Sequence, residues 1–314
     1  MTKNLKYIAL CLFVTLLAIA CSKDGADGND VSKPNEAKKE IGIKPDVWKM
    51  AEATRATTYD NTTLQSGGFT VYAYKAGEST TEYAYINNKT VSYSASSWTI
   101  ADGPYYWPAY HLDFFAYAPN SGSCITGPTY SYSGGQHVAF TCTGLAVTSD
   151  GQSSITEFVY ALAANQNKED HGATGVALSF VHPFSLVKLE LPAGHPNITI
   201  NSITFQTVKN GGTYNNGWTS VTGNENLVWT INAAFDNNTS AQLIGAPFLV
   251  VPQGWTGVIV VNADCLFWGE KVNYPSLTTT VPTTWEAGKS YIYTFNISPD
   301  DLKVETKSTF TEQW

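Results

Sequence analysis

The chain has 314 residues, of which 43% are hydrophobic and 14% charged, and its formal net charge is −8. This length suits one large domain or two ordinary ones, and the hydrophobic fraction is sufficient for real cores. The acidic balance excludes a nucleic-acid partner, because such proteins need a basic surface. Thr, Ser, Asn, Gly and Tyr supply most of the polarity, a composition typical of β-rich proteins.

Residues 1–20 have the features of an export signal. Lys3 and Lys6 precede an uncharged apolar run from Tyr7 to Ala20 that is shorter than the ~20 residues of a spanning helix. A retained membrane anchor is the alternative. The run ends in "LAIAC", which resembles the lipobox of bacterial lipoproteins. This resemblance implies that Cys21 carries a lipid, such as palmitate, that anchors the chain to the outer membrane.

Residues 21–40 are polar and show no hydrophobic periodicity, so we expect a flexible tether there. Asp24, Asp27 and Asp30 make its start acidic. The pattern loosely resembles the acidic tag that sends some lipoproteins to the cell surface, although an ordinary solvated linker has the same composition.

A weak strand is expected within residues 41–55. Ile41 and Ile43 alternate with polar residues, but Pro45 interrupts the pattern because proline donates no backbone hydrogen bond. The same segment contains Arg55, the single arginine of the chain.

From residue 67 onward, short runs of β-branched and aromatic residues alternate with turn residues. Strands are expected at or within 67–74, 81–98, 111–119, 129–142, 184–192, 197–207, 209–218, 246–253, 256–268 and 290–298.

Several local features are more specific. Ile86–Lys89 ("INNK") is expected to form a turn between two short strands, and Gly134–Gly135 to close a hairpin. In 111–119, alternation places Leu112, Phe114 and Ala116 on one face. Residues 155–170 fit either a short helix or a strand over 156–162.

These runs predict an all-β chain built from sandwiches. A polar, Gly-containing segment at 165–175 marks the expected boundary between two β domains. We place the N-terminal domain at 41–170 and the C-terminal domain at 171–314.

Signals for catalysis or metal binding are weak. The five histidines are scattered without metal-ligand spacing, and His182 in "SFVHPF" reads as a hydrogen-bonded structural residue. No serine is paired with a base in a recognisable motif. We therefore expect no enzyme activity, no cofactor and no metal. Tyr105–Tyr110 ("YYWPAY") could stack on a sugar, although filling cores and sheet edges is the commoner role of such residues.

After export, three cysteines remain apart from Cys21. Cys124 and Cys142 flank the expected hairpin, so a disulfide between them is compatible with an exported protein. Two buried free thiols are an equally good interpretation.

Several stretches, taken in order, resemble the fimbrillin-like family of lipoprotein pilins and surface adhesins from Gram-negative anaerobes. They are "FTVYAY", the strand around Trp98, "YYWP", "LDFFAYAP", "VALSFVHPFSLVKLEL" and "WEAGKSYIYTFNIS". "TRAT" around Arg55 matches the place of the family's maturation site. The part that resembles the family's first domain ends with "LDFFAYAP". The stretch "VALSFVHPFSLVKLEL" resembles the strand that opens the family's second domain.

The resemblance implies two tandem transthyretin-like β-sandwich domains and a specific assembly route. An Arg-specific protease would cut between Arg55 and Ala56, and residues 21–55 would leave with the lipid. A strand from another pilin subunit, of the same or another kind, would fill the vacated groove. The implied location is the outer membrane before cleavage and the fimbrium on the cell surface afterwards.

The segment 302–314 alternates cleanly and is a candidate donor strand. Leu302, Val304, Phe310 and Trp314 share one face, and burying them would contribute roughly 6–12 kcal/mol. The pattern suits a final strand of its own domain equally well. The alternative function is a non-polymerising surface lipoprotein, an adhesin that binds a glycan or a host protein.

Overall fold

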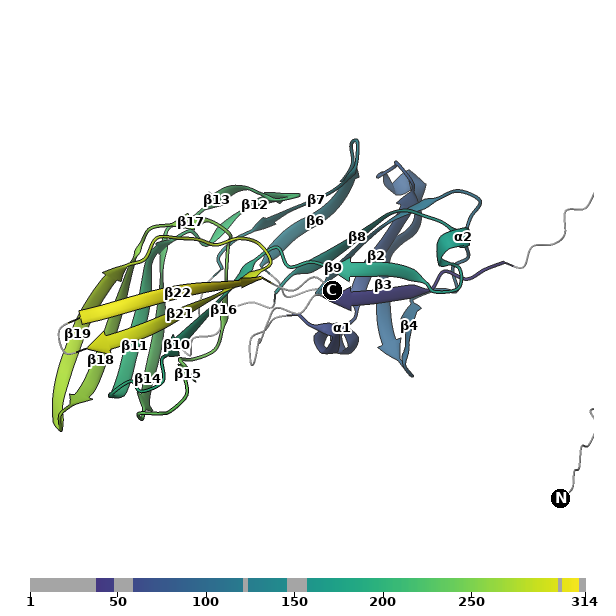
Figure 1. Ribbon diagram of the computed structural model, residues 1–314. Helices are drawn as coiled ribbons and strands as arrows, with labels where there is room; N and C mark the ends of the chain where they lie inside the picture. Colours follow the sequence, from purple (N-terminus) through teal and green to yellow (C-terminus); the bar gives the residue numbers. More distant parts are fainter. Residues whose placement is uncertain (1–37, 48–58, 121–123, 146–156, 299–300, 311–314) are drawn as a thin grey trace, which may run out of the picture. The chain divides into compact units, whose positions relative to one another are not determined.

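The computed structural model (Figure 1) describes residues 38–47, 59–120, 124–145, 157–298 and 301–310. In these ranges the chain forms strands, two short α-helices and one 3-10 turn, so the all-β prediction is confirmed. None of the helices described here is long and apolar enough to cross a membrane.

The first group of strands forms a sandwich of two sheets. One sheet has the strand order β4-β3-β2-β5-β8, and the other pairs β1 with β9 in parallel. Apolar residues of both sheets share one buried cluster, so the sheets face each other across a core. The strands are β1 (Ile43–Val47), β2 (Phe69–Lys75), β3 (Ala84–Ser94), β4 (Ser97–Ile100), β5 (Leu112–Ala118), β8 (Val159–Gln166) and β9 (Val176–Phe180).

The helix α1 (Asn61–Gly67) connects β1 to β2 and has defined ends. The Asp60 side chain accepts a hydrogen bond from the Thr63 amide at 2.7 Å, which caps the first turn. Gly68 ends the helix with φ +66°, and a Cβ there would lie 2.5 Å from the Val91 carbonyl oxygen. The close approach to β3 therefore requires glycine at this position.

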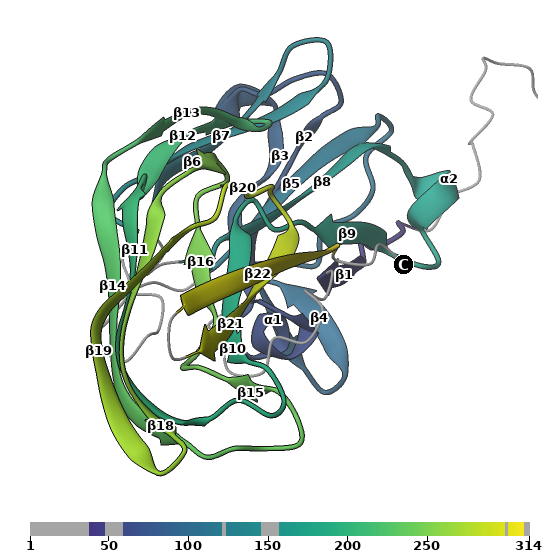
Figure 2. The ribbon, with the colours of Figure 1, turned by 60° about the vertical axis from the view of Figure 1, so that its left-hand side comes forward.

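A second sandwich contains the largest core. Figure 2 shows its two sheets facing each other, β14-β11-β18-β19 on one side and β10-β21-β22 on the other, and their apolar residues form one cluster. Its strands are β10 (Ser185–Leu191), β11 (Asn197–Val208), β14 (Glu225–Phe235), β15 (Gln242–Leu243), β16 (Phe248–Val250), β17 (Gly254–Trp255), β18 (Val258–Phe267), β19 (Glu270–Thr280), β20 (Thr283–Thr284), β21 (Lys289–Ser298) and β22 (Asp301–Phe310).

A third sheet combines strands from distant parts of the sequence. The hairpin β12–β13 (Gly211–Asn215 and Trp218–Thr222) pairs with β7 (Gln136–Cys142), which in turn pairs with β6 (Ile125–Tyr132). Figure 1 shows β12 and β13 running beside β6 and β7. The hairpin expected at Gly134–Gly135 is present between β6 and β7.

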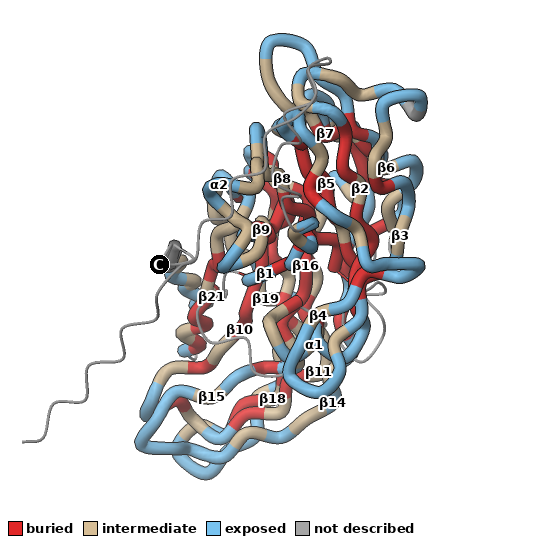
Figure 3. The backbone as a smooth tube through the Cα atoms, turned by 90° about the vertical axis from the view of Figure 1, so that its right-hand side faces the viewer, coloured by how far each residue is buried: buried red, intermediate tan, exposed pale blue. Residues whose placement is uncertain are grey.

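The third sheet explains why β5 is buried on both faces (Figure 3). Phe114 belongs to the core of the first sandwich, whereas Phe115 belongs to a separate cluster with residues of β6, β7 and β12. Alternation alone predicted one buried face, on Leu112, Phe114 and Ala116. That prediction was incomplete because the third sheet, formed by residues within 125–142 and 211–222, covers the other face.

The path of the chain near residue 170 differs from the expected division. The strand β9 lies beside β1, and its buried side chains Val176, Leu178 and Phe180 belong to the core of the first sandwich. The crossing to the second sandwich follows at residues 181–184, before β10. The expected boundary at 170 therefore falls inside the first group of strands.

Two local predictions are also decided. Residues 159–166 form the strand β8, and only α2 (Lys168–His171) is helical, so the strand alternative holds. The turn expected at Ile86–Lys89 is wrong: β3 runs through it with Asn88 at φ +50°, and the chain reverses at Ala95–Ser96.

Candidate functional site

Residues 41–47, the described part of the segment expected to leave, pack into the first sandwich beside β9, and the space that β1 occupies there is called its groove. The strand β1 pairs only with β9, in parallel, so its other edge has no strand partner among the described residues. Ile41, Ile43 and Val47 are buried in the core. Burying three such side chains stabilises the fold by roughly 5–9 kcal/mol before conformational entropy is subtracted.

The same strand is imperfectly fitted. Pro45 pairs with Leu178 but has no N–H to donate to a neighbouring strand. A cavity of about 320 Å³ lies beside the start of β1 and is lined by Gly42, Trp98 and Tyr105, among others. A strand with larger side chains could fill space that this one leaves open.

The end of β1 is tied to α1 by one side chain. The Val47 amide donates to Asn61 Oδ1 at 2.8 Å, and Asn61 Nδ2 donates to Asp46 Oδ1 at 2.6 Å. Asn61 thus hydrogen-bonds the candidate removable strand to the part of the chain that would remain after cleavage.

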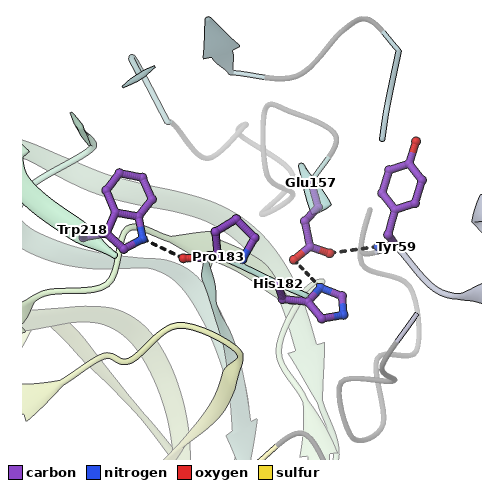
Figure 4. Close-up of polar contacts among 5 residues, drawn as sticks. All are labelled: Tyr59, Glu157, His182, Pro183 and Trp218. Carbon is purple, nitrogen blue, oxygen red and sulfur yellow. Dashed lines mark hydrogen bonds and ion pairs between the residues drawn. The ribbon is translucent and has the colours of Figure 1, made fainter. Parts of the chain in front are cut away.

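Directly beyond the candidate cleavage site, the chain is anchored by a buried acid (Figure 4). The Tyr59 amide donates to Glu157 Oε2 at 2.9 Å, and Glu157 Oε1 lies 2.8 Å from His182 Nδ1. The Glu157 and His182 side chains are at most 1% exposed. A carboxylate this deep requires partners, and these contacts provide them.

The anchor extends to the third sheet. His182 precedes Pro183, whose carbonyl oxygen accepts a 2.7 Å hydrogen bond from Trp218 Nε1 on β13 (Figure 4). One short series of polar contacts therefore joins Tyr59, two residues before α1, to the crossing between the sandwiches and to the hairpin β12–β13. His182 was expected to be a structural histidine, and its contact with Glu157 agrees with that role.

Burial, and then the Glu157 carboxylate, raise the pKa of the Tyr59 phenol to about 12. In unfolded chains tyrosine titrates near pH 10, so the neutral phenol stabilises the fold below that pH and this contribution is lost as pH rises towards 12.

In Tyr59→Phe this pH-dependent contribution is absent. Between pH 9 and pH 11.5, the free energy of unfolding of wild type should therefore fall by roughly 1–2 kcal/mol more than that of the variant. Denaturant titrations at both pH values measure this, and Tyr83→Phe at an exposed tyrosine is the control. Equal losses in Tyr59→Phe and wild type would contradict the prediction.

The candidate donor strand is already part of a sheet. Residues of β22 pair with β21 in antiparallel register from Ser298↔Asp301 to Lys289↔Phe310. Val304 is half-buried and packs against the core of the second sandwich. β22 lies at the edge of its sheet, with β21 as its strand partner. The backbone of Leu302 and Phe310 belongs to this strand, and Trp314 lies outside the described residues.

The two hairpin cysteines are brought together. Cys124 Sγ lies 2.7 Å from Cys142 Sγ, without a covalent bond between them in the structure, and Cys265 is buried elsewhere. The hydrogen bond to Cys142, together with burial, raises the pKa of the Cys124 thiol. The disulfide stays a prediction, which peptide mapping of the exported protein without reductant decides.

The remaining predicted residues fall into two groups. Cys21, Arg55 and Ala56 lie outside the described residues. In "YYWPAY" the structure separates two roles: Trp107 is buried in the first core, whereas Tyr106 and Tyr110 are exposed. In the described part of the chain, no group of three or more His, Cys, Asp and Glu residues is placed to hold a metal ion.

Sequence reasoning missed the two buried acids that organise this region. Glu157 anchors Tyr59 and His182, and Asp113 accepts hydrogen bonds from the amides of Gly77 and Asn165 at 2.9 and 2.7 Å. The available signal was an acid inside an apolar run, in "TEFVYAL" and "LDFFAYAP". Since such an acid must be paired when buried, each stretch pointed to a polar partner but not to its identity.

Comparisons with known proteins agree with this architecture. No curated protein matches the chain. A candidate cell adhesion protein from Bacteroides ovatus is 14% identical, with a TM-score of 0.51 over 87% of this chain and 97% of that one. A similar protein from Bacteroides uniformis is 18% identical, with a TM-score of 0.49 over 87% and 99%. The tip fimbrial protein Mfa3 from Porphyromonas gingivalis is 8% identical, with a TM-score of 0.40 over 77% and 93%.

The similarity to the Bacteroides ovatus protein concerns the fold alone. The family model described as fimbrillin-like matches residues 54–314, which is most of the chain. The chain belongs to the fimbrillin-like family.

Proposed function

We propose that the chain is a structural subunit of a fimbrium, exported as a lipoprotein through Cys21 and assembled by strand exchange after cleavage at Arg55. Family membership supports a role in pili or cell adhesion. The observation that carries the finer proposal is the position of β1: this strand, whose one partner among the described strands is β9, buries its side chains in the core and precedes the single arginine in the sequence.

Cleavage alone does not remove β1, because its side chains stay buried. Before cleavage the covalent chain between β1 and α1 holds β1 at a high effective concentration beside its groove, so a competing strand cannot displace it. After cleavage the released strand, once it dissociates, is lost by dilution. An incoming strand then gains the backbone pairing to β9 and the apolar burial that β1 gives up.

The part of the chain that remains after cleavage has contacts of its own that do not involve β1. The Glu157 contact with the Tyr59 amide and the Asp60 cap of α1 lie on the far side of the cut from β1. They hold the new start of the chain independently of residues 21–55. The bond from Asn61 to β1 is the contact that breaks when the strand leaves.

The first test is an Arg-specific protease added to the purified protein. Wild type is expected to give an N-terminus at Ala56 and a ladder of oligomers on a denaturing gel, because strand-exchanged subunits separate slowly. Arg55→Ala is expected to stay uncut and monomeric, and Arg55→Lys, which keeps the charge but not the recognised residue, to behave in the same way. A ladder from Arg55→Ala equal to that of wild type contradicts the proposal.

A second candidate is a surface adhesin that does not polymerise. The observation that favours it is the complete pairing of β22 with β21, since a donor strand would have to leave its own sheet. Cleaved protein that stays monomeric at high concentration, with no filaments by electron microscopy, would support this candidate over the first.

A further inference from the structure

An open pocket lies at one end of the first sandwich, where β2 ends and β3 begins. It has a volume of about 350 Å³ and is lined by Lys75, Glu82, Tyr83, Ala84, Tyr85 and Tyr110. This volume is at the small end of the range for small-molecule sites, about 300–1,000 Å³. We propose that this pocket binds an uncharged sugar ring. The proposal does not depend on whether the chain assembles.

The tyrosines give the pocket its shape. Tyr83 and Tyr110 are 39% and 40% exposed, which leaves much of each ring open to a ligand. The rings of Tyr85 and Tyr110 are nearly perpendicular, at 89°, with centroids 6.4 Å apart. Two rings at a right angle form a corner, in which a pyranose can lay its C–H face on one ring and keep its hydroxyl rim towards polar groups.

The charges in the pocket select an uncharged ligand. Lys75 provides three donors, and Glu82 provides acceptors for hydroxyl groups. No ion pair joins these two side chains in the part of the chain described here, and both are exposed. Because Lys75 and Glu82 carry opposite charges, the pocket lining has no net charge that would attract a cation or an anion. An aromatic cage for a quaternary ammonium group is therefore the poorer fit.

The walls of the pocket are fixed in place. The Tyr85 hydroxyl donates to the Tyr106 carbonyl oxygen, which lies on the retained part of the chain. On the other side, Asp113 is 1% exposed and accepts from the Gly77 amide, just after Lys75. Preorganised walls reduce the conformational entropy that a weak ligand must overcome.

The test uses saturation-transfer difference NMR on the intact chain with methyl glycosides of glucose, galactose, mannose and N-acetylglucosamine. At least one is expected to receive saturation, with a dissociation constant on the order of 1 mM. Tyr110→Ala is expected to weaken binding about tenfold or more, and Tyr110→Phe, which keeps the ring, to bind nearly as wild type. Both changes are at an exposed side chain, and thermal unfolding confirms that the variants fold.

The matched control is Trp268→Ala. Trp268 is 91% exposed in the turn between β18 and β19, far along the chain from the pocket residues, and its loss is expected to leave binding unchanged. Three results would overturn the proposal: no saturation of any glycoside, binding that Tyr110→Ala leaves intact, or binding that Trp268→Ala abolishes. Saturation of tetramethylammonium in place of the sugars would also overturn it, in favour of a cation cage.

Discussion

Glu157→Ala is expected to lower the free energy of unfolding by about 3–5 kcal/mol, because removing one member of a buried pair leaves the other without compensation. His182 would lose its partner at 2.8 Å, and the Tyr59 amide would lose its acceptor at 2.9 Å. For a chain of this size we expect the midpoint of thermal unfolding to fall on the order of 10 °C.

Two comparisons separate the buried pair from a general effect of removing an acid. Glu286→Ala breaks the ion pair with Lys289, in which the Glu286 side chain is 55% exposed, and should cost less than about 1 kcal/mol. Glu157→Gln keeps an oxygen for the Tyr59 amide, so its cost should be smaller than that of Glu157→Ala. Denaturant unfolding of the three variants under one set of conditions gives these differences.

A double-mutant cycle tests whether Glu157 and His182 act together. His182→Ala should cost a similar amount, and the double variant little more than either single one, since each change already breaks the same contact. Hydrogen exchange at the Tyr59 amide supplies a local measurement and should accelerate in Glu157→Ala. Fully additive losses, or an unchanged Tyr59 exchange rate, would show that the contact does not anchor this part of the chain.

Part of the fold could be predicted from local patterns. The β-branched and aromatic run at 197–207 correctly identified a strand, β11, because such residues favour extended backbone whichever strand is the partner. The pair Gly134–Gly135 correctly identified a hairpin, because glycine tolerates the backbone of a tight turn.

The errors arose where tertiary pairing decided the outcome. Asn87–Asn88 looked like a turn because asparagine accepts the left-handed conformation, and Asn88 does adopt it, at φ +50°. The structure uses Asn88 inside β3, where the register with β2 shifts between Val71 and Ala73. The actual turn uses Ala95 and Ser96, which carry weaker turn signals.

The candidate site likewise has one part that the sequence predicts and another that it does not. The motifs around Cys21 and Arg55 are contiguous and can be read directly from the sequence. The contacts that give Arg55 its context cannot be read in this way: Tyr59 and Glu157 are 98 residues apart, and Glu157 and His182 are 25 apart. Alternation suggested that 302–314 is a strand, but it could not say that β21 is its partner.

The proposal that β1 is the strand replaced during assembly can be tested by locking it in place. Lys44 and Ala177 are register partners on β1 and β9, and both are exposed. Neighbouring strands lie ~4.8 Å apart, within the Cα separations of ~4.4–6.8 Å that disulfides span. The double variant Lys44→Cys/Ala177→Cys, once oxidised, should therefore keep β1 attached to β9 after the chain is cut.

Assembly of the oxidised double variant should fall to zero although cleavage at Arg55 proceeds normally, because the groove stays occupied. The fragment that contains β1 should remain bound on a non-reducing gel, and reductant should release it and restore the ladder. The single variants Lys44→Cys and Ala177→Cys, and wild type with and without reductant, control for Cys124, Cys142 and Cys265. An oligomer ladder from protein whose β1 is demonstrably still cross-linked would mean that assembly uses a surface other than this groove.

The same locked protein should still bind the sugar in the tyrosine pocket, since the residues that line the pocket lie on other strands and loops. Loss of assembly with retention of sugar binding would assign the two properties to separate parts of the first sandwich.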